Sequence, residues 1–293
     1  MRSSIVNMSS VLPTIERLSS RVIRILGLNP GPFTLQGTNT YLVGTGRRRI
    51  LIDTGEGREG YPALVKEVLQ QQDCNIEHVL VTHWHGDHVG GIRDVCELQT
   101  DDTVSLFKFP RLSTRDETIG VNISYSFLNK EEEVFETEGA TLRALYTPGH
   151  TDDHMAIILE EENALFSGDC ILGEGTAVFE DLYDYMKSLQ RLSALNPTKI
   201  YPGHGPVVEN AKEVMEGYIA HRNQREKQIL DVLESGEQSG YSAMDLVKVI
   251  YKDTPEHLHV AAASNVAHHL QKLCKENRIC RSDVGERWTV SKL

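Results

Sequence analysis

Short apolar runs that end in tight turns recur along the first two-thirds of the chain, as expected for strands of a sheet. Four of them cover residues 79–81, 141–146, 164–166 and 199–201, and Gly or Pro-Gly follows each of the last three. Between residues 21 and 43, further β-like runs are interrupted at 29–32 and 36–39, which predicts a meander with loops near the same edge. We expect the four strand ends to converge on one edge of the fold.

Two other segments have the apolar spacing of an amphipathic helix. Residues 61–72 follow the apolar run 50–52 and place Leu64, Val68 and Leu69 on one face. Residues 181–195 repeat this spacing with Leu182, Met186, Leu189 and Leu192. Strands followed by helices, in two halves, predict an α/β fold in which two sheets pack face to face between outer helices. The predicted architecture is a four-layer αββα sandwich.

The C-terminal quarter has a different pattern. Residues 209–234 are typical of one or two helices, and Ser242 to Asp245 resembles a capping box that starts a helix running to Tyr251. A second helix is expected at about 257–276. The β-like runs 278–281 and 287–290 flank a turn at 283–286, which predicts a hairpin. Two helices followed by a hairpin indicate a winged-helix-like domain.

These patterns divide the 293 residues into a flexible leader with a potential targeting role (1–20), a large domain (21–220) and the winged-helix-like domain (221–293). No apolar stretch approaches the roughly 20 residues that span a bilayer, so we expect no membrane segment. The net charge of −12 argues against a surface that coats nucleic acid throughout. Residues 221–293 are nearly neutral, with 11 Lys and Arg against 10 Asp and Glu.

The hexapeptide that follows the run 79–81 has the composition of a metal site. It is His83-Trp84-His85-Gly86-Asp87-His88, with three imidazoles and one carboxylate in six positions. This mixture of nitrogen and oxygen ligands suits Zn²⁺ or a similar divalent ion. Three more residues of ligand type follow the later strand runs, namely His150, Asp169 and His204.

In order, type and local context, these motifs resemble those of the metallo-β-lactamase superfamily, with Asp53 in LIDTG as the first of them. The resemblance covers about residues 20–215. It implies a dinuclear centre with two zinc ions per chain. One ion would bind His83, His85 and His150, the other would bind Asp87, His88 and His204, and Asp169 would bridge them. A pair of such ions shares a hydroxide and is suited to hydrolysis.

Three residues beside these ligands allow a second interpretation. Asp53 either orients the metal loop by hydrogen bonds, as the resemblance implies, or caps a turn after its strand. His154 either makes a loop rigid or donates to a substrate phosphate. Trp84 should point away from the metals and pack in the core, if the segment keeps the alternation of a strand.

With the winged-helix-like end included, the chain resembles the lactamase-beta-like protein 2 group, animal endoribonucleases of the mitochondrial matrix. The resemblance implies hydrolysis of phosphodiester bonds in single-stranded RNA by a hydroxide held between two zinc ions, in mitochondrial RNA turnover. Asp87 would orient the nucleophile as the catalytic residue. The basic residues expected to contact RNA are Lys272, Lys275, Arg278, Arg281 and Arg287. The alternative activity is a thioester hydrolase like glyoxalase II.

The two ends of the chain give different indications of localisation. The Ser-rich first 20 residues, with one acidic residue, Glu16, are compatible with import into the mitochondrial matrix. The terminal Ser-Lys-Leu reads as a peroxisomal address. Five cysteines without a CxxC pair favour reduced thiols, as in the matrix or the cytosol. For the oligomeric state, we expect a monomer or a weak homodimer.

Overall fold

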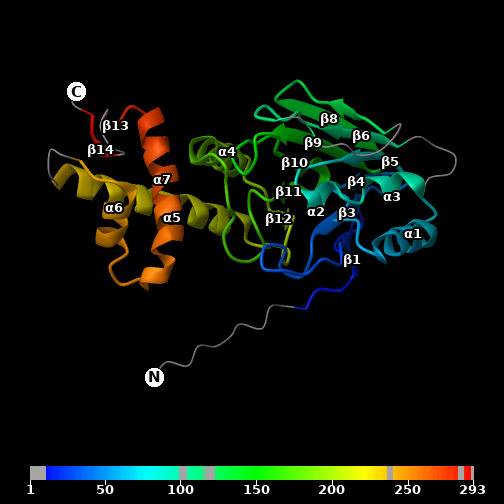
Figure 1. Ribbon diagram of the computed structural model, residues 1–293. Coiled ribbons are helices and arrows are strands. Elements are labelled where there is room, and N and C mark those ends of the chain that lie inside the picture. Colours follow the sequence, from blue (N-terminus) through cyan, green and yellow to red (C-terminus); the bar gives the residue numbers. More distant parts are fainter. Residues whose placement is uncertain are drawn as a thin grey trace.

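A large two-sheet core and a smaller C-terminal unit make up the protein (Figure 1). The computed structural model describes residues 11–98, 104–114, 116, 123–235, 240–282 and 287–291. The first half of the leader, the turn expected at 283–286 and the last two residues of Ser-Lys-Leu lie outside these ranges. Among the described residues, no helix combines the length and apolar character that a membrane span needs.

A seven-stranded sheet forms one half of the core. Its first four strands pair antiparallel, and the strands from the fourth onward pair parallel. In order across the sheet, the strands are β1 (Ile15–Arg17), β2 (Val22–Leu26), β3 (Asn39–Val43), β4 (Arg48–Ile52), β5 (Asn75–Leu80), β6 (Ser105–Lys108) and β7 (Tyr125–Phe127).

A five-stranded sheet forms the other half. Three of its pairings are antiparallel, and the pairing of β11 with β12 is parallel. In order across the sheet, the strands are β12 (Lys199–Pro202), β11 (Ala164–Gly168), β10 (Met155–Leu159), β9 (Ala140–Tyr146) and β8 (Glu132–Thr137).

The two sheets face each other across a hydrophobic core. On β10, Met155, Ile157 and Leu159 belong to the cluster between the sheets, whereas Ala156 and Ile158 belong to the cluster under the outer helices. Successive side chains of a strand point to opposite faces, so a strand buried on both faces is apolar throughout, as β10 is.

Helices cover both outer faces. The helices α1 (Tyr61–Gln72) and α3 (Ile92–Glu97) pack on the seven-stranded sheet, and α4 (Leu182–Ala194) packs on the five-stranded sheet. The two single turns α2 (Gly86–Val89) and η1 (Glu160–Glu162) complete the core. The predicted four-layer αββα sandwich is confirmed, with α1 at its predicted bounds.

The helix α5 (Ala211–Ser235) joins the core to the C-terminal unit without a break. Met215 and Tyr218 pack in the core cluster that holds α4, whereas Ile229 and Leu233 pack in the C-terminal cluster. The domain boundary expected at residue 220 therefore falls inside one continuous helix, whose two halves stabilise different hydrophobic clusters.

The C-terminal unit has the order of elements expected of a winged helix. It comprises α6 (Ala243–Ile250), η2 (Glu256–Leu258), α7 (His259–Lys275) and the hairpin strands β13 (Ile279–Arg281) and β14 (Trp288–Val290). Ser242 and Asp245 form the predicted capping box at the start of α6. The helix α7 packs against α4, so the unit lies directly beside the core (Figure 1).

Candidate metal centre

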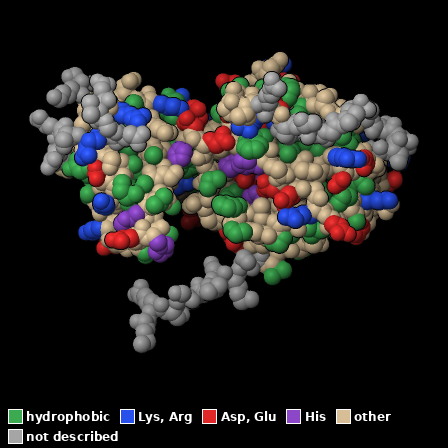
Figure 2. Space-filling model, in the orientation of Figure 1, with side chains coloured by type: hydrophobic (Ala, Val, Ile, Leu, Met, Phe, Trp, Pro, Cys, Tyr) green, Lys and Arg blue, Asp and Glu red, His purple; other side chains and the backbone are tan. Residues whose placement is uncertain are grey.

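The predicted ligands come together at one edge of the two sheets, because each follows a strand that ends there. The segment 83–88 follows β5 and turns into α2, His150 follows β9, Asp169 follows β11 and His204 follows β12. Figure 2 shows His side chains gathered in a hollow between the core and the C-terminal unit. Residues far apart in the sequence therefore share one site.

Three imidazoles form the first ligand cluster. His83 Nε2 lies 2.9 Å from His85 Nδ1, and His150 Nε2 lies 3.2 Å from each of these two atoms. A tetrahedral zinc ion with bonds of about 2.0–2.1 Å separates its ligand nitrogens by about 3.3 Å. The three nitrogens are thus spaced as one ion would require.

The second cluster consists of two imidazoles and a carboxylate. Asp87 Oδ2 lies 3.4 Å from His88 Nε2 and 3.2 Å from His204 Nε2. Thr38 Oγ1 donates a hydrogen bond of 3.1 Å to the same carboxylate oxygen. The carboxylate of Asp87 is therefore oriented by the loop that precedes β3.

Asp169 lies between the two clusters. Its Oδ2 is 3.7 Å from His150 Nε2 and 3.3 Å from His204 Nε2, and its Oδ1 is 3.5 Å from His88 Nε2. One carboxylate thus faces imidazoles of both clusters, which is the position that a bridging ligand requires.

The hydrogen bonding of two buried atoms shows whether these residues could hold a metal ion. His88 Nε2 and Asp169 Oδ1 have no hydrogen-bond partner in the described part of the chain, although both face the space that the ligands enclose. Buried polar atoms are normally paired, and a divalent cation would satisfy both. The set of imidazole nitrogens and carboxylate oxygens suits zinc, so the residues fit the group.

The electrostatics of the two clusters differ. Burial and the neighbouring His150 lower the pKa of His85 to about 4, and burial lowers the pKa of His83 well below its usual value. At His204, burial also disfavours the charged form, but Asp169 and Asp87 outweigh it and raise the pKa to about 9. The first cluster is therefore neutral at pH 7, as metal ligation requires, whereas binding at His204 would displace a proton.

Asp53 fits both roles that the sequence allowed. Its backbone adopts φ 57° after β4, as in a turn, and its carboxylate accepts hydrogen bonds from Thr82 N and Thr82 Oγ1, each at 2.8 Å. Its Oδ2 also accepts a hydrogen bond of 2.7 Å from His88 Nδ1, which leaves Nε2 directed at the second cluster. Asp53 does not reach the clusters itself and orients a predicted ligand.

His154 stabilises the loop and does not face the pocket. It is fully buried, its Nδ1 lies 2.9 Å from Thr147 Oγ1, and its Nε2 accepts a hydrogen bond of 3.2 Å from Asp169 N. Contact with a substrate phosphate is excluded by this burial. The imidazole instead holds the backbone of Asp169.

The prediction that Trp84 packs in the core was wrong. The strand β5 ends at Leu80, so the alternation of a strand does not continue through residue 84. Trp84 is half-buried and packs under the Arg111 guanidinium, 4.3 Å from its ring centroid, and beside the His85 ring. It flanks the metal loop and lies outside the main hydrophobic core.

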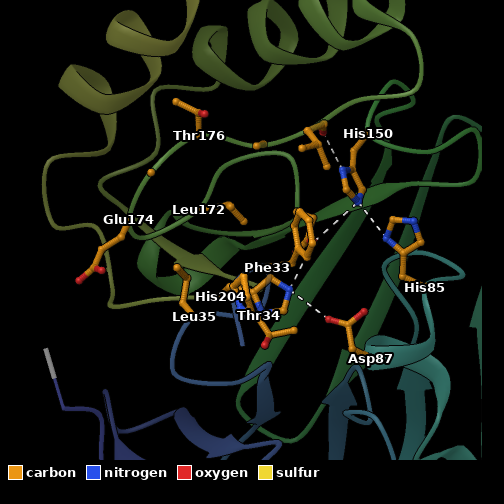
Figure 3. A pocket seen from close by; sticks show the side chains of 15 residues that line it. Phe33, Thr34, Leu35, His85, Asp87, His150, Leu172, Glu174, Thr176 and His204 are labelled. Carbon is orange, nitrogen blue, oxygen red and sulfur yellow. Dashed lines mark hydrogen bonds and ion pairs between the residues drawn. The ribbon is translucent and has the colours of Figure 1, made fainter. Parts of the chain in front are cut away.

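A pocket of about 410 Å³ opens above the clusters, with His85, Asp87, His150 and His204 on its floor (Figure 3). Its walls come from the loop 32–35 and the segment 172–178. Phe33 stands at the rim with 81 % of its surface exposed. The sequence predicted a loop near this edge but did not single out Phe33.

Of the five basic residues expected to contact RNA, one is buried and four are exposed at the surface. Lys272 is buried and pairs with Glu226, so its proposed RNA contact is corrected, because α7 turns this side chain toward α5. The other four are exposed, and each has an intramolecular interaction: Lys275 pairs with Asp181, Arg278 with Glu226 and Arg287 with Asp245, and Arg281 lies near the Trp288 ring.

Comparison with known families decides the classification. A model of the metallo-β-lactamase superfamily matches residues 33–204. The chain belongs to the metallo-β-lactamase superfamily. Its members are hydrolases, and the two ligand clusters at the sheet edge agree with a metal-binding hydrolase of this superfamily. A model of the beta-lactamase associated winged helix domain matches residues 242–288.

Relatives of this metallo-β-lactamase superfamily chain carry different names. A beta-lactamase-like protein 2 homolog of Drosophila melanogaster is 51 % identical over 92 % of this chain and 93 % of its own length. An atrochrysone carboxyl ACP thioesterase of Passalora fulva is 43 % identical over 82 % of this chain and 71 % of its own. The crystal structure of a beta-lactamase domain protein from Burkholderia ambifaria has the same fold, with a TM-score of 0.74 and 20 % identity over 97 % of this chain and 96 % of its own.

Proposed function

We propose that the protein is a zinc-dependent endoribonuclease that hydrolyses phosphodiester bonds of single-stranded RNA. The observation that carries the proposal is the position of Asp169 between two ligand clusters at the floor of an open pocket with an exposed aromatic rim. When bound, two zinc ions would supply Lewis acidity and lower the pKa of water toward neutrality. The resemblance to lactamase-beta-like protein 2 agrees with this activity.

The ligand side chains also have roles of their own. His83, His85 and His150 would hold one ion, and Asp87, His88 and His204 the other, with Asp169 shared. Asp87 remains ionised, because neighbouring His88 and His204 lower the pKa of its carboxyl even though burial opposes this. Its carboxylate is fixed by Thr38 and faces the pocket, so it can accept a hydrogen bond from an attacking water and orient it.

The shape of the pocket supports a single-stranded substrate. Only 34 residues separate Asp169 from His204, and within them lies α4, which packs on the sheet and does not cover the pocket. An exposed ring such as Phe33 offers a face on which any unpaired base can stack. A base beside the broken bond would therefore have a platform at the rim.

A thioester hydrolase is the second candidate. Two relatives of this chain, from Passalora fulva and Paecilomyces divaricatus, are named thioesterases. The pocket wall is also largely apolar, with Leu35, Leu172 and Val178, and Glu174 is the one charged residue besides the ligands among the lining residues that the structure describes. Such a wall suits an acyl chain as well as a base.

The decisive experiment compares three substrates with one preparation of protein. Fluorescent single-stranded RNA, an acyl-glutathione thioester and duplex DNA are incubated with zinc-loaded protein of measured metal content. We expect cleavage of the RNA alone, and we expect a chelator or Asp87→Ala to abolish it. Thioester turnover with intact RNA would replace the first candidate with the second.

We also propose that the protein acts in the mitochondrial matrix. This proposal is based on the resemblance to the lactamase-beta-like protein 2 group and on the Ser-rich composition of the leader. A fluorescent protein fused after residue 20 of the leader should enter mitochondria. A fusion that keeps only the C-terminal Ser-Lys-Leu tests the peroxisomal alternative, and cytosolic fluorescence of both would contradict both addresses.

A further inference from the structure

The pocket wall at residues 172–181, called here the wall segment, contacts a metal ligand through its backbone. The carbonyl oxygen of Val178 accepts a hydrogen bond of 2.8 Å from His150 Nδ1, drawn as a dashed line above His150 in Figure 3. In metal sites, the partner of the second ring nitrogen fixes both the tautomer and the orientation of the ligand. The position of the Val178 carbonyl therefore determines how His150 faces the first cluster.

Val178 cannot fix this position with its own side chain, which is 60 % exposed. Its neighbours do so instead. On one side, the amide of Glu180 donates to the carbonyls of Gly149, at 2.8 Å, and His150, at 3.1 Å. These bonds join residue 180 of the wall segment to the loop that carries His150. The residues directly before and after Val178 are held by a different part of the chain.

That support comes from Arg222 on α5. Arg222 Nη2 donates a hydrogen bond of 3.2 Å to the carbonyl oxygen of Ala177, and its guanidinium lies 5.2 Å from the ring centroid of Phe179. It thus holds the residue before Val178 by the backbone and the residue after it by the side chain.

The surroundings of Arg222 make this contact unusual. The residue is only 5 % exposed, and within the described ranges it makes no salt bridge with a carboxylate. The carboxylate of Glu226, one turn further along α5, pairs with Lys272 and Arg278 instead. A buried charge without a counter-ion is costly. A neutral side chain of similar length would pack there at lower cost, so the guanidinium has a role that packing does not explain.

We propose that Arg222 is a positioning residue of the metal centre, which holds the wall segment so that the Val178 carbonyl orients His150. The inference rests on the zinc centre of the proposed function and does not depend on RNA as the substrate. It also gives the C-terminal quarter of the chain a role at the site, because α5 carries Arg222 and continues into that unit.

The helix α7 adds to the same support. The ring of His268 lies edge-on to Phe179, with 5.3 Å between centroids, and Lys275 pairs with Asp181, whose side chain caps the start of α4. Side chains of both α5 and α7 therefore contact the wall segment and stabilise its position. The winged-helix-like unit contributes to the metal centre by packing, whether or not it binds nucleic acid.

The test compares zinc binding by two matched variants. Arg222→Met removes the hydrogen bond and the charge, and Arg225→Met does the same three positions along α5, where the guanidinium stacks on Tyr251 and does not contact the wall segment. Zinc affinity is measured by competition with a chromogenic chelator. Direct partners of a ligand typically contribute 10–100-fold to affinity, so a residue one step further out should contribute about three- to tenfold.

We expect Arg222→Met to weaken one of the two zinc sites by this factor, with faster amide exchange of Glu180, and Arg225→Met to bind zinc like the unaltered protein. Arg222→Lys, which keeps one donor, should recover part of the loss. Equal zinc affinity of both methionine variants would overturn the inference. Should Arg222→Met not fold, Arg222→Lys is measured in its place, and unchanged affinity and exchange there overturn it as well.

The same measurements separate this inference from the proposed function. If the unaltered protein binds no zinc, the zinc centre fails and the inference fails with it. If the unaltered protein binds zinc and Arg222→Met binds it equally well, only the role of Arg222 is rejected. If RNA stays intact while the zinc affinities differ as expected, the role of Arg222 stands and the substrate is wrong.

Discussion

His88 Nδ1 donates a hydrogen bond of 2.7 Å to Asp53 Oδ2, and this bond joins the end of β4 to the loop after β5. Burial disfavours the charged form of His88, but Asp53, Asp87 and Asp169 together raise its pKa well above the usual value. The same bond keeps the proton on Nδ1 when His88 is neutral, so Nε2 is free to ligate.

The substitution Asp53→Asn should therefore weaken metal binding without removing a ligand. The introduced amide can turn its NH₂ toward His88 Nδ1, which favours the tautomer with the proton on Nε2. We expect zinc affinity, measured by chelator competition, to fall about 10–100-fold. Asp73→Asn is the control, because Asp73 also has a positive φ but is exposed and distant from the ligands. Equal affinities of the two variants would contradict the orienting role.

A buried ion pair between Lys108 and Asp153, close to the loop that carries His150, should raise the free energy of unfolding. Lys108 is fully buried, its Nζ donates to Asp116 Oδ1 at 2.7 Å, and it lies 2.9 Å from Asp153 Oδ2. Lys108→Met leaves the Asp153 carboxylate buried without its cation, and breaking a buried pair in this way costs about 3–5 kcal/mol.

Urea unfolding of metal-free protein measures this cost, and Lys227→Met is the matched control. Lys227 pairs with Asp231 on the exposed face of α5, so its loss should change the free energy of unfolding by at most about 0.5 kcal/mol. If Lys108→Met unfolded at the same urea concentration as the control, the buried pair would not stabilise the fold.

The positions of the ligands could be predicted because they depend on short-range patterns. Each of His150, Asp169 and His204 follows an apolar run and a turn, and the end of a strand fixes the edge at which the next residue lies. The helix α4 and the capping box at Ser242 were predictable for the same reason, since spacing and capping are local.

What could not be predicted depends on contacts between distant segments. The burial of Lys272 follows from the packing of α7 on α5, which no local pattern reveals. The role of Val178 comes from its backbone carbonyl, which every residue type has. For Trp84, the expectation failed because the chain leaves the sheet four residues earlier, at Leu80.

Phe33 should contribute to RNA binding more than to the chemical step. Stacking of a base on an aromatic ring is worth about 1–3 kcal/mol, so Phe33→Ala should raise KM for single-stranded RNA by roughly 5- to 150-fold while kcat changes little. Phe33→Trp should retain binding. Phe127→Ala removes another exposed ring, on β7 and outside the pocket lining, and should leave KM unaltered. An unchanged KM in Phe33→Ala would exclude stacking at this rim.

The exposed arginines of the hairpin should contribute less to RNA binding than Phe33, and their contribution should decrease with salt concentration. Arg281 is exposed on β13 and lies near the Trp288 ring, and Arg287 pairs with Asp245 and also donates to the Gly240 carbonyl. In an Asp87→Ala background, which prevents cleavage, we expect Arg281→Ala to weaken RNA binding equally for all sequences. The slope of log affinity against log salt should fall by about 0.7, the value for one phosphate contact on a single strand. Arg47→Ala, which removes an exposed arginine far from the hairpin, should leave the slope unchanged. Identical slopes for both variants would show that the hairpin does not touch the RNA backbone.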